Sequence, residues 1–273
     1  MAHKVVFIDI MMKMESLSQK NYSKTLIVLL LILTGLLSQA QSCVCYQNHF
    51  LNDYKEADFI AQVTVTNVES DFRLENEDLI EFDTSIIFKG SESKSFFIQQ
   101  EVGNSSDNSK CRLFLKPGDE LIVFAQLVNG AIITTPCHRN NFIYKDDPKF
   151  LLENKNLIGT LNTLSLFNEQ IEASSINCSS LENDTDVINK VGKLNLAESD
   201  AYFGLYNIKF TEDNSISYVG VISPFNKEID KKIRIMLIKK EWEECALNEN
   251  RELLVAYFYH PASTYRKEYL STY

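Results

Sequence analysis

The sequence predicts a mixed β and α+β protein built from two domains. In the first half of the chain, short segments alternate apolar and polar residues, which is typical of a β-protein with many short strands. In the second half, two strands, one amphipathic helix and a further strand follow one another. Residues 161–189 between them are polar and irregular, as in a linker. We therefore expect a leader over residues 1–42, a first domain over 43–160 and a second over 190–273.

The leader has the three parts of a secretory signal. Lys20 and Lys24 supply positive charge, and the apolar run 25–37 is shorter than the roughly 20 residues that a membrane span needs. We expect export to the outside of the cell or to the periplasm and cell envelope, with no stable membrane span after cleavage. An uncleaved anchor is the alternative.

Two cleavage sites compete at the end of the leader. Cleavage after Ala40-Gln41-Ser42 releases Cys43 as the new N-terminus, whereas cleavage after Ser38-Gln39-Ala40 releases Gln41. Lipid attachment at Cys43 is a third possibility, on a poor match to the motif. The choice decides whether Cys43 carries a free α-amine.

Charge and cysteine content exclude some classes of function. The chain has 27 basic and 37 acidic residues, and loss of the leader removes four lysines, one aspartate and one glutamate, leaving 23 against 35. Such an acidic protein is a poor binder of nucleic acid. Six cysteines in an exported chain predict disulfides. Zinc binding by these cysteines is disfavoured, because no Cys-x-x-Cys pair is present.

The first domain is expected to be a small closed barrel. Asn129-Gly130 is a hairpin turn signal, and Pro148 is suited to the first position of a helix that runs to about Asn156. Five strands and a closing helix indicate a five-stranded barrel of the OB type. The expected strands are residues 59–65, 80–88, 95–101, 120–126 and 131–135.

The second domain is expected to be a β-β-α-β unit with an antiparallel sheet. Its strands are predicted at 202–211, 215–222 and 252–259, with the helix after Pro224. Trp242 is expected to pack the end of this helix against the sheet. Four apolar residues fall on one face of the helix: Ile229, Ile233, Met236 and Leu237.

The cysteine pattern of the first domain carries a resemblance. Cys43-Val44-Cys45, the strand end Phe88-Lys89-Gly90, the segment 111–118, the run 120–125 and Cys137-His-Arg-Asn140 occur in this order. In this pattern the domain resembles the netrin-like domain of the tissue inhibitors of metalloproteinases, and above all its short bacterial members. One further cysteine pair of the animal inhibitors is absent here.

The resemblance implies the disulfides Cys43–Cys111 and Cys45–Cys137. By elimination, the third bridge would be Cys178–Cys245. It also implies a mechanism, in which the Cys43 α-amine and carbonyl oxygen bind the catalytic zinc of a target protease. An α-amine with a pKa of about 7.7–8.0 is partly neutral near neutral pH. Val44 would enter the pocket for a substrate side chain, and Cys45 would line its edge.

The second domain resembles the C-terminal domain of TonB. The segments 210–216 and 223–230, Trp242-Glu-Glu-Cys-Ala246 and the last strand into Pro261 carry this resemblance. It implies a sheet whose edge can pair with a peptide. The membrane anchor and the Pro-rich spacer of an energy transducer are missing.

Two functions remain open at the level of sequence. One is inhibition of a zinc metalloproteinase through Cys43, Val44 and Cys45; the other is a non-catalytic module that binds proteins of the cell envelope or the extracellular space. An enzyme is not expected, since no catalytic constellation stands out and a disulfide-bonded Cys137 beside His138 is no nucleophile. No cofactor and no metal of the protein's own are expected.

Overall fold

The computed structural model describes most of the two expected domains. The expected leader, Cys43, Val44 and the expected Cys178–Cys245 bridge lie outside the described part. No helix of the described part combines the length and the apolar character that crossing a membrane requires. The described residues are 45, 49–70, 72, 76–100, 111–145, 148–176, 201–240, 242, 247, 249–260 and 269–271.

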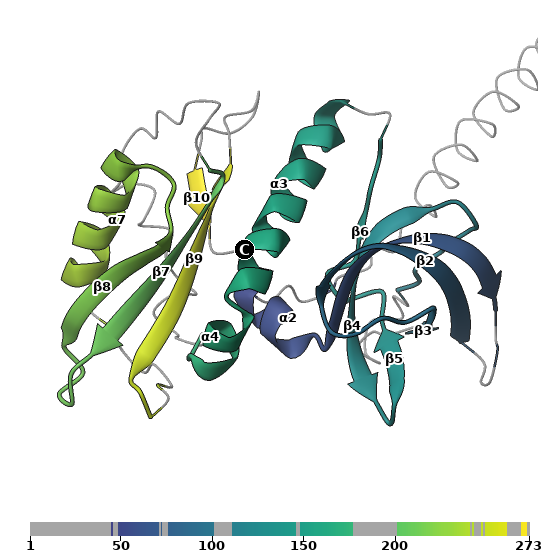
Figure 1. Cartoon of the computed structure of the whole chain (residues 1–273), viewed down its shortest axis with the longest axis horizontal. Helices are drawn as coiled ribbons and strands as arrows, with labels where there is room; N and C mark the ends of the chain where they lie inside the picture. Colours follow the sequence, from purple (N-terminus) through teal and green to yellow (C-terminus); the bar gives the residue numbers. More distant parts are fainter. Residues whose placement is uncertain are drawn as a thin grey trace, which may run out of the picture. The chain divides into compact units, whose positions relative to one another are not determined.

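Five strands of the first half close into a mixed β-barrel (Figure 1). They follow the order β1-β2-β3-β5-β4, and β1 pairs with β4 to close the ring. The pairing of β3 with β5 is parallel, and the other pairings are antiparallel. A short strand β6 (Asn141–Phe142), which was not expected, is added beside β4. The barrel strands are β1 (Phe59–Glu69), β2 (Glu77–Lys89), β3 (Ser95–Gln99), β4 (Glu120–Val128) and β5 (Ala131–Thr134).

Alternating side chains fill the barrel, as the sequence pattern predicts. Residues at every second position of β1 are buried in one core cluster with residues of β2, β3 and β4. On β4, residues on both faces are buried, which agrees with its nearly continuous apolar sequence. The core cluster consists of Phe59, Ala61, Val63, Val65, Ile80, Phe82, Phe96, Ile98, Leu121, Val123 and Ala125.

In the described part of the chain, three helices precede or follow the barrel strands in sequence. Helix α2 (Phe50–Glu56) was not expected, and α3 (Pro148–Leu166) runs ten residues past the expected end at Asn156. Residues 161–176 are therefore largely helical where an irregular linker was expected, because α4 (Asn168–Ala173) follows α3 directly. The physical reason is burial, since Leu161, Leu164 and Ile171 are fully enclosed in a core cluster shared with α2.

The second half forms a four-stranded antiparallel sheet in the order β10-β9-β7-β8 (Figure 1). Its elements are β7 (Phe203–Phe210), β8 (Ile216–Ser223), α7 (Lys227–Lys239), β9 (Glu252–His260) and β10 (Tyr269–Ser271). Ile229, Ile233, Met236 and Leu237 of α7 are all buried against one sheet face, as predicted.

Trp242 also takes the expected role. Its indole N–H donates to the Leu237 carbonyl at 3.1 Å, and its ring meets Phe210 edge-on with centroids 5.7 Å apart. The last strand, β10, was not expected, because Tyr265, Tyr269 and Tyr273 of the sequence recur at helical spacing. Leu270 of β10 is buried, which explains why this segment joins the sheet.

The two edges of this sheet differ. At its first residues, β9 pairs in parallel with Ser175, and at its last residues it pairs with β10. Strand β8 is the opposite edge, and Tyr218 and Val221 are exposed there. Among the described strands of this sheet, β8 and the three-residue β10 are thus the two outer strands, and β8 offers the longer unpaired edge.

Candidate functional site

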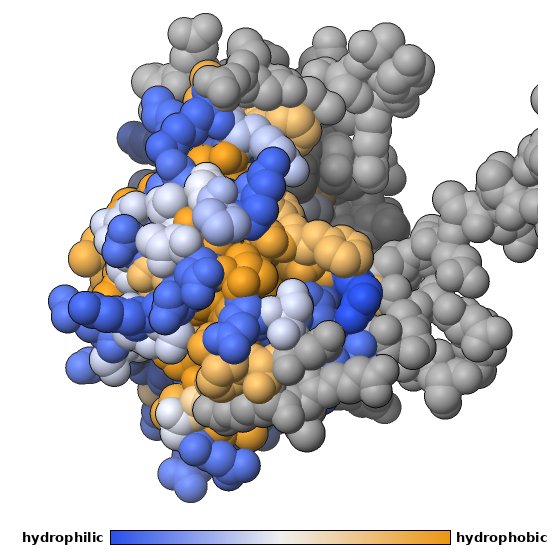
Figure 2. Space-filling model, turned by 90° about the vertical axis from the view of Figure 1, so that its right-hand side faces the viewer, coloured by the Kyte–Doolittle hydropathy of each residue, from blue (hydrophilic) through white to orange (hydrophobic). Residues whose placement is uncertain are grey.

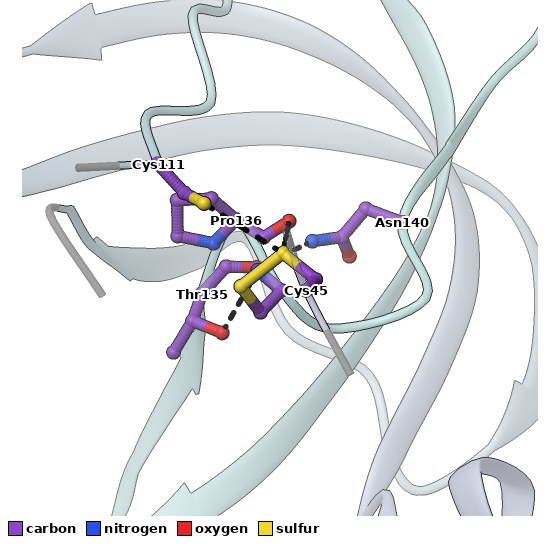
Figure 3. The surroundings of a disulfide bond; sticks show 6 residues. Cys45, Cys111, Thr135, Pro136 and Asn140 are labelled. Atoms are coloured by element: carbon purple, nitrogen blue, oxygen red, sulfur yellow. Dashed lines mark hydrogen bonds between the residues drawn. A yellow bond between two sulfur atoms is a disulfide. The ribbon is translucent and has the colours of Figure 1, made fainter. Parts of the chain in front are cut away.

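Three cysteine sulfurs converge at one end of the barrel (Figure 3). Cys45 is disulfide-bonded to Cys137, the second of the two pairings that the resemblance implies. The Sγ atom of Cys111 lies 3.8 Å from that of Cys45. Cys111 is itself disulfide-bonded, to a partner outside the described residues, so the implied Cys43–Cys111 pairing cannot be compared with it. The segment at Cys45 is therefore fixed to the barrel beside a second disulfide.

The loop that carries Cys137 is held by hydrogen bonds to β4 and within itself. The Asn140 side chain accepts from the Phe124 N–H at 3.0 Å and donates to the Thr135 carbonyl at 2.9 Å. The buried Thr134 hydroxyl donates to the Phe124 carbonyl at 2.7 Å. The Cys45 sulfur faces the Pro136 carbonyl, with the two atoms 3.9 Å apart (Figure 3). The loop has its hydrogen bonds satisfied on the barrel side, which limits its freedom.

Arg139 binds this loop to helix α2. Its Nε lies 2.5 Å from a carboxylate oxygen of Asp53, and both side chains are about four-fifths buried. The guanidinium also lies over the ring of Phe50, 5.1 Å from its centroid. Because α2 follows Cys45 in the chain, the disulfide and Arg139 hold the same segment at two points.

A small cavity lies behind the disulfide. It has a volume of about 70 Å³ and is lined by Asp53, Glu56, Gln126, Cys137 and His138, among others. Burial lowers the pKa of His138 below its ordinary value, against the smaller raising effects of the Phe124 carbonyl and of the Asp53 and Glu56 charges. His138 is thus favoured in its neutral form. A space of this size has room for a few water molecules, whereas ligand pockets measure about 300–1,000 Å³.

The other end of α2 is held by Lys89 of β2. Its ammonium group donates to the carbonyls of Tyr54 and Lys55, at 2.9 and 3.0 Å, and lies 2.7 Å from the Glu172 carboxylate. Burial, together with the charge of Glu172, raises the pKa of Tyr54 to about 12. This lysine satisfies the carbonyls at the end of a short helix, a task that a C-terminal cation performs well.

The segment after Cys111 is anchored by Gln100 and carries an exposed aromatic side chain. The buried Gln100 amide exchanges two hydrogen bonds with the Leu113 backbone, at 2.8 and 2.9 Å. Next to it, Phe114 is 77% exposed. Figure 2 shows the barrel side of the molecule, where apolar surface lies among polar side chains. The exposed large apolar residues of the first half include Phe72, Phe114, Leu127, Val128 and Tyr144.

Sequence reasoning found only part of this site. It grouped Cys45, Cys111 and Cys137, which the structure brings together. It missed Asp53 and Arg139, whose pairing joins residues 86 positions apart. The position of Arg139, two residues after a cysteine in the motif, was the available signal. Asp53 had none, because α2 itself was not expected.

Comparisons with known proteins gave no match. No family model matches the chain, and no curated protein does. What can be proposed about function therefore depends on the residues and their geometry.

Proposed function

We propose that this protein is an exported inhibitor of a zinc metalloproteinase, acting through the N-terminus at Cys43. The observation that carries the proposal is the fixed position of Cys45, bonded to Cys137 with the Cys111 sulfur 3.8 Å away. Two residues of chain span at most about 7 Å, so a ligand group at Cys43 starts close to a rigid point.

The chemistry of the inhibitor is that of a bidentate backbone ligand. The neutral α-amine and the carbonyl oxygen of Cys43 would replace the water on the zinc of the protease, which needs such an open position for catalysis. Val44 would fill the pocket for a substrate side chain. A rigid N-terminal segment binds with a smaller loss of conformational entropy, and the Arg139–Asp53 ion pair supports that rigidity.

The topology of the barrel supports the same family. A closed barrel in the order β1-β2-β3-β5-β4, with β3 and β5 parallel, fits the OB type that netrin-like domains have. We propose a netrin-like domain over residues 43–160 and a TonB-like domain over 190–273. The sheet order of the second half, with α7 on one face, supports the latter.

A single added residue tests the mechanism. The exported protein is first weighed intact, so that preparations beginning at Cys43 are used. These are assayed against a broad panel of zinc proteases, together with a variant that has one alanine before Cys43. The addition displaces the amine, and inhibition should disappear. Val44→Ala is the matched control, because it keeps the amine and should change only which proteases are inhibited.

Two outcomes would reject the proposal. A protein that begins at Cys43, with Cys45 and Cys137 bonded, and that slows no zinc protease of the panel is not an inhibitor of this kind. Inhibition that survives the added alanine rejects the chelation mechanism.

A non-catalytic binding module of the cell envelope is the second candidate. The observation that favours it is the outer edge of β8, with exposed Tyr218 and Val221. An edge strand can pair with an extended peptide of a partner protein. Binding of this kind should survive the added alanine before Cys43 and should fail when Val221 is replaced by proline, which obstructs pairing along the strand.

A further inference from the structure

Helix α7 has an exposed face whose chemistry is unlike that of the rest of the chain. We call it the outer face of α7. Ile235 and Ile238 lie on it with 45% and 54% of their surface exposed, although the helix buries four other apolar residues against the sheet. The remaining exposed residues of α7 include Lys227, Lys231, Lys232, Arg234 and Lys239.

The arrangement of these residues follows from helical geometry. With 3.6 residues per turn, Ile235, Ile238 and Lys231 fall in the middle of the exposed arc. Lys227 and Arg234 fall on one side of them, and Lys232 and Lys239 on the other. The two isoleucines are thus flanked by positive charge on both sides.

The charge of this face is opposite to that of the whole protein. The chain has a net charge of −10, yet α7 contains five basic and two acidic residues. One of the acids, Asp230, is buried and accepts hydrogen bonds from the Tyr206 hydroxyl at 2.7 Å and the Phe225 N–H at 3.1 Å. Only Glu228 offsets the five cations on the exposed side.

A groove continues this face toward strand β8. It has a volume of about 800 Å³ and is lined by Val221, Pro224, Lys227, Glu228, Asp230, Lys231 and Arg234. The Arg234 Nε donates to the Val219 carbonyl at 3.0 Å, which fixes the arginine over the strand. Its three cations face two carboxylates, of which Asp230 is buried and hydrogen-bonded to Tyr206. The cations and the neighbouring apolar side chains form a suitable place for phosphate groups that border a hydrocarbon layer.

We propose that the outer face of α7 binds the surface of a membrane that contains anionic lipids. Ile235 and Ile238 enter the boundary between headgroups and acyl chains, while the lysines extend sideways to the phosphates. A lipid surface suits this face better than an acidic protein does, because the apolar pair lies on a convex helix with cations on both flanks. This proposal is independent of the inhibitor function and uses none of its residues.

Vesicle flotation with the exported full chain tests the proposal. The vesicles contain phosphatidylcholine alone or phosphatidylcholine with about 30% phosphatidylglycerol, a fraction chosen to give an anionic surface. Binding should be at least about tenfold stronger to the anionic vesicles and should weaken as salt is raised. Equal binding to both vesicle types, or no binding, overturns the proposal.

Two pairs of charge reversals distinguish binding through the outer face of α7 from binding that depends only on the net charge of the protein. Lys231→Glu with Lys232→Glu changes the outer face, whereas Lys94→Glu with Lys116→Glu makes the same change of net charge at exposed barrel positions. The first pair should abolish binding and the second should leave most of it. Equal losses overturn the proposal.

Substitution of the two isoleucines distinguishes binding to a lipid surface from binding to an acidic protein partner. Ile235→Ser with Ile238→Ser should lower binding to anionic vesicles by about tenfold or more, because two apolar side chains no longer enter the interface. Circular dichroism checks that the variants keep their fold. If the wild-type protein binds soluble polyglutamate and not the vesicles, the outer face belongs to an acidic protein partner and the lipid proposal is wrong.

Discussion

The guanidinium of Arg139 lies 2.5 Å from the carboxylate of Asp53, so the loop after Cys137 is bound to the helix that follows Cys45. The two side chains are largely shielded from water. Substituting one residue of such an ion pair is costly, because the other charge stays partly buried without its partner. The stability of the candidate site should therefore depend on this contact.

Arg139→Ala should lower the free energy of unfolding by about 1–3 kcal/mol. The variant loses the ion pair with Asp53 and the contact with the Phe50 ring. Lys145→Ala is the matched control, since Lys145 pairs with Glu120 from a side chain that is 65% exposed. That change should cost about 0–1 kcal/mol. Urea denaturation measures both, and equal costs would contradict the expected role of Arg139.

Removal of the disulfide should have a larger effect. The bond joins residues 92 positions apart, so it restricts the unfolded chain strongly. Replacing Cys45 and Cys137 together by alanine should cost about 2–4 kcal/mol in denaturant unfolding. Protease inhibition, where it occurs, should weaken in the same variant. A variant with unchanged stability would show that other contacts alone hold Cys45 to the barrel.

His138 should make stability fall in mild acid. Its pKa is lowered by burial in the folded state, so below the unfolded value of about 6.5 the unfolded chain binds a proton that the folded protein does not. His138 makes its full contribution to the free energy of unfolding above about pH 6.5. This contribution decreases as the pH falls toward the lowered pKa of the folded state. The loss between about pH 7.5 and 5.5 should be smaller in His138→Gln. An identical loss in wild type and variant would contradict the assignment.

Buried tyrosines should make stability fall in alkali. Burial raises the pKa of Tyr54 to about 12, and burial with the hydrogen bond to Asp230 raises that of Tyr206 as well. Above about pH 10 the unfolded chain loses protons that the folded protein keeps, so each group lowers stability by about 1.4 kcal/mol per pH unit. For Tyr54 the decrease ends near pH 12. Tyr54→Phe should reduce this slope in urea denaturation at increasing pH.

Gly90 should tolerate no side chain. Its φ is +91°, and an added Cβ would lie 2.6 Å from the Asp58 carbonyl oxygen. Gly90→Ala should therefore cost more than the roughly 1 kcal/mol that the left-handed backbone alone requires. Gly130→Ala isolates that backbone cost, because Gly130 has a φ of +81° and open space around it. Thermal unfolding should rank the two variants in this order.

Much of the fold could be predicted because its strands are half buried. Alternation located β1 and β2, a nearly continuous apolar run located β4, and the helical spacing of Ile229 and Ile233 located α7. Helix α2 was missed because it has only seven residues and its N-cap, His49, makes no side-chain capping bond. Strands β6 and β10 are too short to show a period.

The candidate site was predictable only where residue type carried the signal. The order of the cysteines predicts which of them pair. The Arg139–Asp53 and Lys89–Glu172 ion pairs carry no such signal, because they join common residue types that are far apart in the sequence. The end of α3 was missed for another reason. The exposed Leu151, Leu152 and Leu166 and the buried Asn154 and Thr160 blur the apolar spacing of its inner side.

The Cys45–Cys137 bond encloses all five strands of the barrel within one covalent ring. Tension applied to the two ends of the chain would pass through the sulfur bridge and would not reach β1–β5. A single peptide-bond cleavage between the two cysteines would likewise release no fragment from the molecule. For a protein expected to meet proteases outside the cell, the ring keeps the barrel in one piece for as long as the disulfide is oxidised.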